Sequence, residues 1–153
     1  ELPSSIRGKN GAAETIENNI RSTIIKDNLL DPAYFEKMSG LLDDLIKQRK
    51  DEVIEYAEYL KRIADLAIHV SNGRSDSTPK SLNTKAKVAL FNNLNEDEAL
   101  ALEIDALIVG SKSDGWRGNQ AKENQIKQAL FRLLANQDKV EAIFKVIIQQ
   151  DEY

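Results

Sequence analysis

Apolar residues recur along this chain at intervals of three and four positions, the spacing that places side chains on one face of an α-helix. The segment from Tyr56 to Val70 shows this most clearly, because charged residues occupy the positions between the apolar ones. Its apolar positions are Tyr56, Tyr59, Leu60, Ile63, Leu66, Ala67 and Val70. This pattern predicts an amphipathic helix with one buried face.

Similar patterns before and after this segment predict further helices. Their expected inward positions are Ala13, Ile16, Ile20 and Ile24; Tyr34, Met38, Leu41, Leu42 and Leu45; Leu82, Ala86, Ala89 and Leu90; Leu100, Ile104, Leu107 and Ile108; Ile126, Ala129, Leu130, Leu133 and Leu134; and Val140, Ile143, Phe144, Ile147 and Ile148. Glu17 falls off the apolar face of the first helix, and only the β-branched run 146–148 would also suit a strand. With about seven helices and essentially no strand, we expect an all-α fold in a single compact domain.

Capping residues locate several helix ends. Asp31 followed by a proline predicts a helix start, and so does Asn119. The segment 95–98 has the spacing of a capping box. Residues 1–10 are predicted to be a linker, which makes 1–29 a lead-in with a first short helix and 30–153 the helical domain.

Composition excludes several classes of site. With 153 residues, 41% hydrophobic, the chain can bury a core. It has no cysteine and a single histidine, His69, which excludes thiolate metal sites and, without residues from a partner, multi-histidine metal sites. No apolar stretch suits a membrane span, and no signal peptide is recognisable. Because the chain begins at Glu1 and its only methionine is Met38, we expect a piece of a longer protein.

Charge is segregated along the chain, although the net charge is only −4. Residues 71–94 and 112–132 are basic, and residues 95–109 carry acids and no base. If the basic stretches meet, they could follow a phosphate backbone. The candidate DNA-binding residues are Lys112, Arg117, Asn119, Lys122 and Lys127, with Lys85 and Lys87 as second candidates. However, Lys122, Lys127 and Arg132 are spaced by five and cannot form one helical stripe, so a solvated helix explains them equally well.

The only tryptophan, Trp116, lies between Gly115 and Gly118 and beside Arg117. Such a segment suits a tight turn and neither a helix nor a strand interior. One interpretation is a rigid recognition element that presents the ring and the guanidinium. The other is that Trp116 fills the core while Arg117 faces water.

The sequence contains no phosphate-binding loop, no dinucleotide fingerprint and no zinc-protease motif. Asp43 and Asp44 could act as an acid/base pair, and a small stand-alone enzyme remains an alternative. Adjacent residues on a helix point about 100° apart, which does not suit that role. We therefore expect no catalytic residue, no metal and no cofactor in this piece.

Several segments together resemble the C-terminal region of the R subunits of type I restriction-modification enzymes, in the IC-like branch. The resemblance is carried by Met38–Lys50, Tyr56–Ala67, Ala89–Leu94, Trp116–Asn119 with the helix after it, and Gln149–Tyr153. It covers roughly residues 30 to 153. It implies a bacterial, cytoplasmic parent chain that is an ATP-dependent type I deoxyribonuclease. Such a chain also translocates DNA, and it uses ATP and Mg²⁺ in domains upstream of this piece.

For this piece the resemblance implies a non-catalytic domain. It would help the R subunit to assemble with the modification and specificity subunits of the methyltransferase core, and help to hold double-stranded DNA. The remaining domains of the R subunit are further expected partners, and no contact with a membrane is expected. Residues expected in a partner-docking or structural motif are Arg49, Tyr59, Trp116, Gly118 and Tyr153. The alternative is a pure protein-docking module that does not contact DNA.

Overall fold

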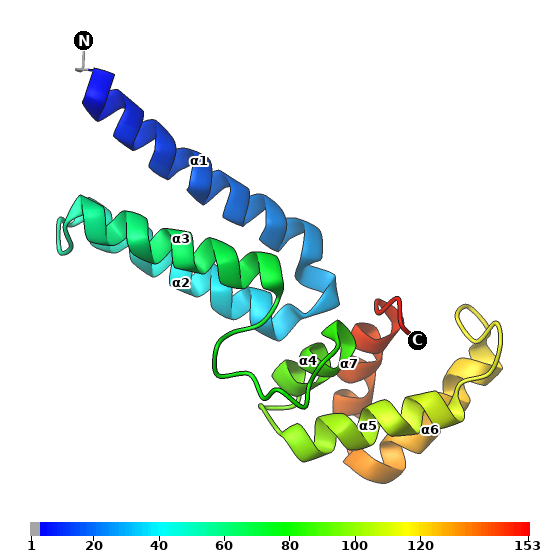
Figure 1. The fold of residues 1–153 in the computed structure, drawn as a ribbon. Helices are drawn as coiled ribbons and strands as arrows, with labels where there is room; N and C mark the ends of the chain where they lie inside the picture. The colour runs from blue at the N-terminus through cyan, green and yellow to red at the C-terminus, as the bar shows by residue number, and fades with distance from the viewer. Residues whose placement is uncertain (1–3) are drawn as a thin grey trace. The chain divides into compact units, whose positions relative to one another are not determined.

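In the described part of the chain, every regular element is helical, as the apolar spacing predicts (Figure 1). The computed structural model describes residues 4–153, and the side chains of residues 11–153. The elements are α1 (Ser4–Asp27), the short 3-10 helix η1 (Asn28–Leu30), α2 (Pro32–Lys50), α3 (Tyr56–Asn72), α4 (Lys85–Asn93), α5 (Glu98–Ser111), α6 (Gln120–Leu134) and α7 (Gln137–Ile148). For residues 4–153, the predicted all-α class with about seven helices and no strand is confirmed.

The helices gather into two compact units, which are described separately. The first unit contains the described residues up to Asn28 together with Phe35–Ser75. The second contains Leu29–Tyr34 and Asp76–Tyr153. The short segment Leu29–Tyr34 therefore packs with the second unit, although the residues on either side of it in the sequence belong to the first.

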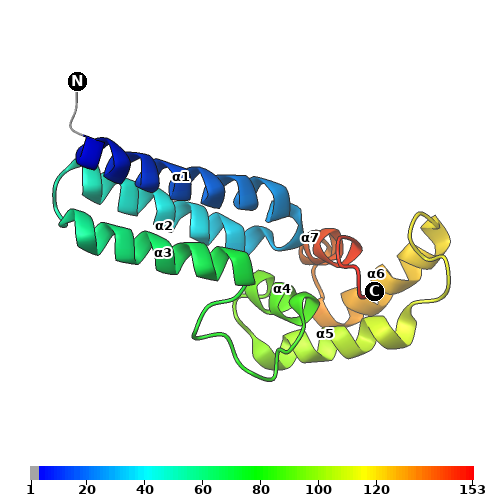
Figure 2. The ribbon, with the colours of Figure 1, turned by 45° about the horizontal axis from the view of Figure 1, so that its top comes forward.

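The first unit consists of α1, α2 from Phe35 onward, and α3, and these helices lie alongside one another in Figure 2. Helix α1 packs directly on α3. The apolar faces supply a buried core of Ala13, Ile20, Phe35, Met38, Leu42, Tyr59, Ile63, Leu66 and Val70. The predicted inward face of the Tyr56–Val70 segment thus accounts for much of this core, whose burial is the main favourable contribution to the unit's stability.

The second unit is built from four helices in which each packs on two others. Helices α4 and α6 both contact α5 and α7. The core between them contains Leu82, Ala86, Leu90, Phe91, Ala101, Ile104, Ile108, Trp116, Ile126, Leu130, Val140, Ile143, Phe144, Ile147 and Tyr153, among other residues. The β-branched run at 146–148, which would also suit a strand, is helical and lies in α7.

Two of the predicted caps are present. The Tyr34 N–H donates to Asp31 Oδ1 over 3.2 Å at the start of α2. The Lys122 N–H donates to Asn119 Oδ1 over 3.1 Å at the start of α6. These bonds satisfy main-chain donors that a helix start leaves without a partner.

Three predicted boundaries differ from the structure. Helix α1 is 24 residues long and begins at Ser4, inside the predicted linker, because its two glycines and its polar residues weaken a helix without breaking it. Helix α4 begins at Lys85 and so does not include Leu82, which the pattern places in it; its N-cap is Thr84, which accepts from the Lys87 N–H. The cap of α5 is Asp97, which accepts from the Leu100 N–H over 3.0 Å, and not Asn95.

The reason for the shifted cap of α5 is the turn that precedes it. Asn95 and Glu96 have left-handed φ angles of 57° and 59°, and the Glu96 N–H donates to the Phe91 carbonyl. The helix can start only after this turn, at Glu98, whose side chain accepts from the Ser81 hydroxyl instead of closing a capping box. Across the described residues, no helix combines the length and the apolar character that crossing a bilayer requires.

Candidate functional site: the Trp116 turn

The segment between α5 and α6 is a pair of consecutive turns around Trp116. The Trp116 N–H donates to the Ser113 carbonyl over 3.2 Å, and the Asn119 N–H donates to the Trp116 carbonyl over 3.1 Å. Gly115 and Gly118 have φ angles of 67° and 78°, a region that side chains other than glycine rarely adopt. The glycines on both sides of the tryptophan are thus explained by the backbone that the turn requires.

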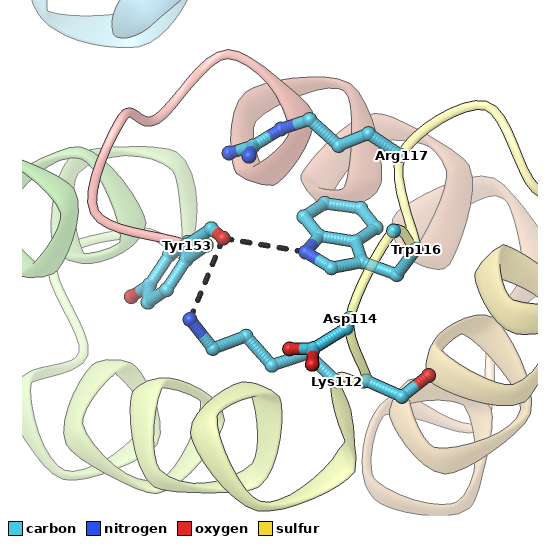
Figure 3. Close-up of a pocket in the computed structure, with 7 residues that line it drawn as sticks. Lys112, Asp114, Trp116, Arg117 and Tyr153 are labelled. Carbon is cyan, nitrogen blue, oxygen red and sulfur yellow. Dashed lines mark hydrogen bonds between the residues drawn. The ribbon is translucent and has the colours of Figure 1, made fainter.

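Trp116 fills the core of the second unit and binds the last residue of the sequence. Its side chain is 4% exposed and meets the Phe144 ring edge to face, with ring centroids 6.2 Å apart. Its indole Nε1 donates to the main-chain oxygen of Tyr153 over 3.3 Å, and Lys112 Nζ lies 3.4 Å from the same oxygen (Figure 3). The interpretation of Trp116 as a core residue is confirmed.

Arg117 does not simply face water. Its guanidinium lies 4.7 Å from the centre of the Trp116 ring, where the negative face of the indole attracts a cation (Figure 3). Its Nε donates to the Ile148 carbonyl over 3.3 Å, and its Nη2 donates to the Gln150 carbonyl. Arg117 therefore ties the turn to the end of α7 and the residues after it.

The segment Gln149–Tyr153 is also fixed at other points. Gln150 is buried, and its Nε2 donates to the Leu30 carbonyl over 2.7 Å and to the Val146 carbonyl over 3.0 Å. A Glu152 carboxylate oxygen accepts from the Ala86 N–H over 2.9 Å, at the start of α4. This segment thus connects Leu30, α4, α7 and the Trp116 turn within the second unit.

The Tyr153 side chain points into the same unit, where its hydroxyl donates to Asp105 Oδ1 on α5. Burial raises the pKa of the Tyr153 phenol above its ordinary value, and the neighbouring Asp105 carboxylate raises it further. The phenol therefore stays protonated and acts as a donor. Beside it, Lys112, Asp114, Trp116 and Arg117 line a small pocket of about 240 Å³.

The candidate DNA-binding residues fall into two groups. Lys112, Arg117, Asn119 and Lys122 meet at the Trp116 turn, where Lys122 Nζ donates to the Asp114 carbonyl. Lys127 does not join them, since it pairs with Glu141 over 3.2 Å and covers the Phe144 ring.

The second candidates lie on α4. Lys87 donates to the Asn83 side chain over 3.1 Å, while Lys85 is exposed to solvent. Asn119 uses its side-chain oxygen as the cap of α6, so that oxygen has a structural role. The structure thus gathers three of the six basic candidates around one turn and leaves Lys127 and the two lysines of α4 out of that group.

Arg49 and Tyr59 meet in the core of the first unit, around a residue that the sequence pattern misplaces. The pattern puts Glu17 off the apolar face, but its side chain is on the buried side of α1 and the residue is 9% exposed. The Tyr59 hydroxyl donates to Glu17 Oε1, and Arg49 Nη2 donates to the same oxygen over 3.2 Å. The Arg49 guanidinium also covers the Tyr59 ring at 5.2 Å.

This cluster joins α1, α2 and α3 through one carboxylate. A buried carboxylate is tolerated because a cation and a hydroxyl satisfy it. Burial raises the pKa of Tyr59 above its ordinary value, and its hydrogen bond to Glu17 raises it further. One signal in the sequence was available, because Glu17 stands four positions after Ala13 and three before Ile20, in register with the buried face.

A second buried carboxylate holds the segment Leu29–Tyr34 in the second unit. Asp31 accepts from Asn92 Nδ2 over 2.8 Å and from Asn93 Nδ2 over 2.7 Å, and the Ala33 N–H donates to Asn93 Oδ1 over 3.2 Å. Burial raises the pKa of Asp31 from 3.8 to about 6, although its hydrogen bonds with Asn92, Tyr34 and Asn93 lower it. Sequence identifies Asp31 as a cap but gives no sign of the two asparagines.

Nothing in the described side chains, residues 11–153, groups histidine and carboxylates as a metal ion would require. The Asp43 carboxylate, one half of the acid/base alternative, binds Arg21 over 2.8 Å.

Comparison of the chain with protein-family models, with curated proteins and with solved structures gave no match.

Proposed function

We propose that this chain is a non-catalytic helical domain from the C-terminal region of the R subunit of a type I restriction-modification enzyme. In that role it contributes to assembly of the R subunit with the methyltransferase core and to binding of the DNA that the complex moves. The nuclease and the ATP- and Mg²⁺-dependent motor of such an enzyme belong to the parent chain. The proposal rests on the resemblance in sequence together with how the resembling segments lie in the fold.

The observation that carries the proposal is that the most specific of the resembling segments bind each other. Trp116 and Arg117 contact the main chain of residues 148–153, and this segment in turn reaches Leu30 and α4. Residues that share such contacts are expected to be retained together in sequences with this fold. The tryptophan motif and the closing residues therefore support a domain of this kind together, because their contacts explain why both are found in one sequence.

The DNA-binding half of the proposal is supported by charges at the Trp116 turn. Arg117 and Lys122 donate to main-chain carbonyls, which position their side chains but do not neutralise them. Lys112 lies in the same turn region, and Lys85 is exposed on α4. Cations held in place at a surface can neutralise phosphates of any sequence, which gives salt-dependent binding without base recognition.

One observation favours the second candidate, a protein-docking module without DNA contact. Lys127 forms an ion pair with Glu141, and the Asn119 oxygen caps α6, so two of the candidate residues are already occupied. Fewer free cations mean fewer phosphate contacts and a weaker affinity for duplex DNA.

The proposal is tested by removing residues 1–153 from the full R subunit. A cut before Asp31 is less suitable, because it leaves α1 without α3, its packing partner. We expect the deletion to weaken assembly with the methyltransferase core and to lower both the affinity for duplex DNA and its salt dependence. Unchanged assembly and unchanged DNA binding would refute the proposal.

The two candidate functions are separated by glutamine substitutions that remove charge but keep a hydrogen-bond donor. Lys112→Gln, Lys122→Gln and Lys85→Gln in one R subunit should reduce the slope of log K against log salt by up to about 0.9 for each phosphate that is no longer neutralised. The matched control is Lys127→Gln, because its charge is already paired. If the slope of log K against log salt is unchanged in both variants and assembly is intact, the DNA-binding role is wrong and the protein-docking module is the remaining candidate.

A further inference from the structure

Helices α2 and α3 leave a groove between them in the first unit, with a volume of about 400 Å³. Its walls are residues 41–48 of α2 and residues 62–69 of α3. In each helix the lining positions recur at intervals of three, four and seven, so both walls present one face over about two turns, a length of roughly 10 Å. A groove with these walls suits a third helix of about the same length better than it suits a flat surface.

The floor of the groove is apolar and partly open to solvent. Leu41, which the sequence places on the inward face of its helix, is 42% exposed. Leu45 is half-buried beside it, and Leu66 forms a buried wall opposite. Leu41 is exposed because no other described element of the first unit fills the groove at this position, and covering it would bury apolar surface.

The rim of the groove carries unpaired negative charge. Asp44 on α2 and Asp65 on α3 line it, both exposed, and neither forms an ion pair with another described residue. The one arginine of the rim, Arg62, is already paired, because its Nε donates to a Glu58 carboxylate oxygen over 2.9 Å. The groove therefore presents two carboxylates, Asp44 and Asp65, that are not paired with a cation, and such charges attract a positively charged partner.

We propose that this groove binds a basic amphipathic helix of the methyltransferase core, with apolar side chains on Leu41 and Leu45 and lysine or arginine beside Asp44 and Asp65. This inference rests on the proposed role in assembly and assigns it to a surface. The sign of the rim charge opposes a phosphate backbone or an anionic membrane at this site. The surface for assembly is then distinct in its residues from the cations of the Trp116 turn.

The test measures the Kd between the full R subunit and the methyltransferase core. We expect the pair Asp44→Lys and Asp65→Lys to raise Kd by about a hundredfold and Leu41→Ala to raise it by about tenfold. A matched control for charge is the pair Glu36→Lys and Asp51→Lys, which makes the same change at exposed positions outside the groove. The control for the leucine is Ile68→Ala, at a 56% exposed residue that does not line the groove.

Salt gives a second measurement. Kd of the unchanged protein should rise with ionic strength, and the pair Asp44→Asn and Asp65→Asn should flatten this dependence, because screening acts only on charges that are present. Circular dichroism establishes that each variant is folded.

The outcomes separate the two proposals. If removal of residues 1–153 disrupts assembly while the groove variants behave like their controls, the groove is not the docking site and the proposed function stands. If the controls weaken assembly as much as the groove variants, net charge is responsible and the inference is overturned. If the removal itself has no effect on assembly, the inference fails together with the assembly role on which it rests.

Discussion

Truncating Trp116 should destabilise the second unit by a predictable amount. Its side chain is 4% exposed, packs on Phe144 and donates to the Tyr153 main-chain oxygen. Replacing such a buried side chain with alanine costs about 3–5 kcal/mol, from reduced burial and from the cavity that remains. For a protein of this size the change corresponds to a fall in Tm of on the order of 10 °C.

The indole also supports Arg117, and a double-mutant cycle measures that contribution separately. If the guanidinium is attracted to the ring, Trp116→Ala and Arg117→Ala should not be additive, and their coupling should be about 0.5–1 kcal/mol for a partly exposed cation–π pair. Urea unfolding followed by far-ultraviolet circular dichroism is the assay, because the chain has no other tryptophan to report fluorescence. A cost of less than about 1 kcal/mol for Trp116→Ala would refute the reasoning, since it is below the range for buried aromatic side chains.

Three further experiments test other parts of the structure. Tyr59→Phe removes a hydroxyl that donates to buried Glu17, so the unfolding free energy should fall by about 1.5–3 kcal/mol in urea titrations, and no change would show that the carboxylate is satisfied without it. The pKa of Asp31 is raised in the folded state to about 6. Between pH 3.8 and about 6, the Asp31 carboxyl is therefore protonated in the folded protein and ionised in the unfolded protein. Stability relative to an Asp31→Asn variant should therefore be highest below pH 3.8 and fall by roughly 3 kcal/mol as the pH rises from 3.8 through about 6. Parallel pH profiles of the two proteins would contradict this. Gly118→Ala should lower the free energy of unfolding by about 1–2 kcal/mol because φ is 78° there. Gly110→Ala, inside α5, should raise it by about 0.5–1 kcal/mol. If thermal unfolding shows that both substitutions change stability in the same direction, the turn geometry is wrong.

The sequence alone determined what depends on neighbours within a turn or two. Apolar residues at intervals of three and four predict a helix because that spacing repeats on one side of a period of 3.6 residues. Caps at Asp31 and Asn119 could be predicted for the same reason, since each side chain accepts from an N–H three residues later. Glycines beside Trp116 predict a turn because glycine adopts the positive φ angles of tight turns without a steric penalty.

Only the tertiary structure decided which polar residues are buried and what they bind. Gln150 reaches the Leu30 carbonyl across 120 positions of sequence, and Tyr59 reaches Glu17 across 42. No local pattern encodes such pairs, because a polar residue is buried only where the fold brings it a partner that compensates for the loss of water. The exposure of Leu41 has the same origin, since an apolar face becomes core only where another element of the chain covers it.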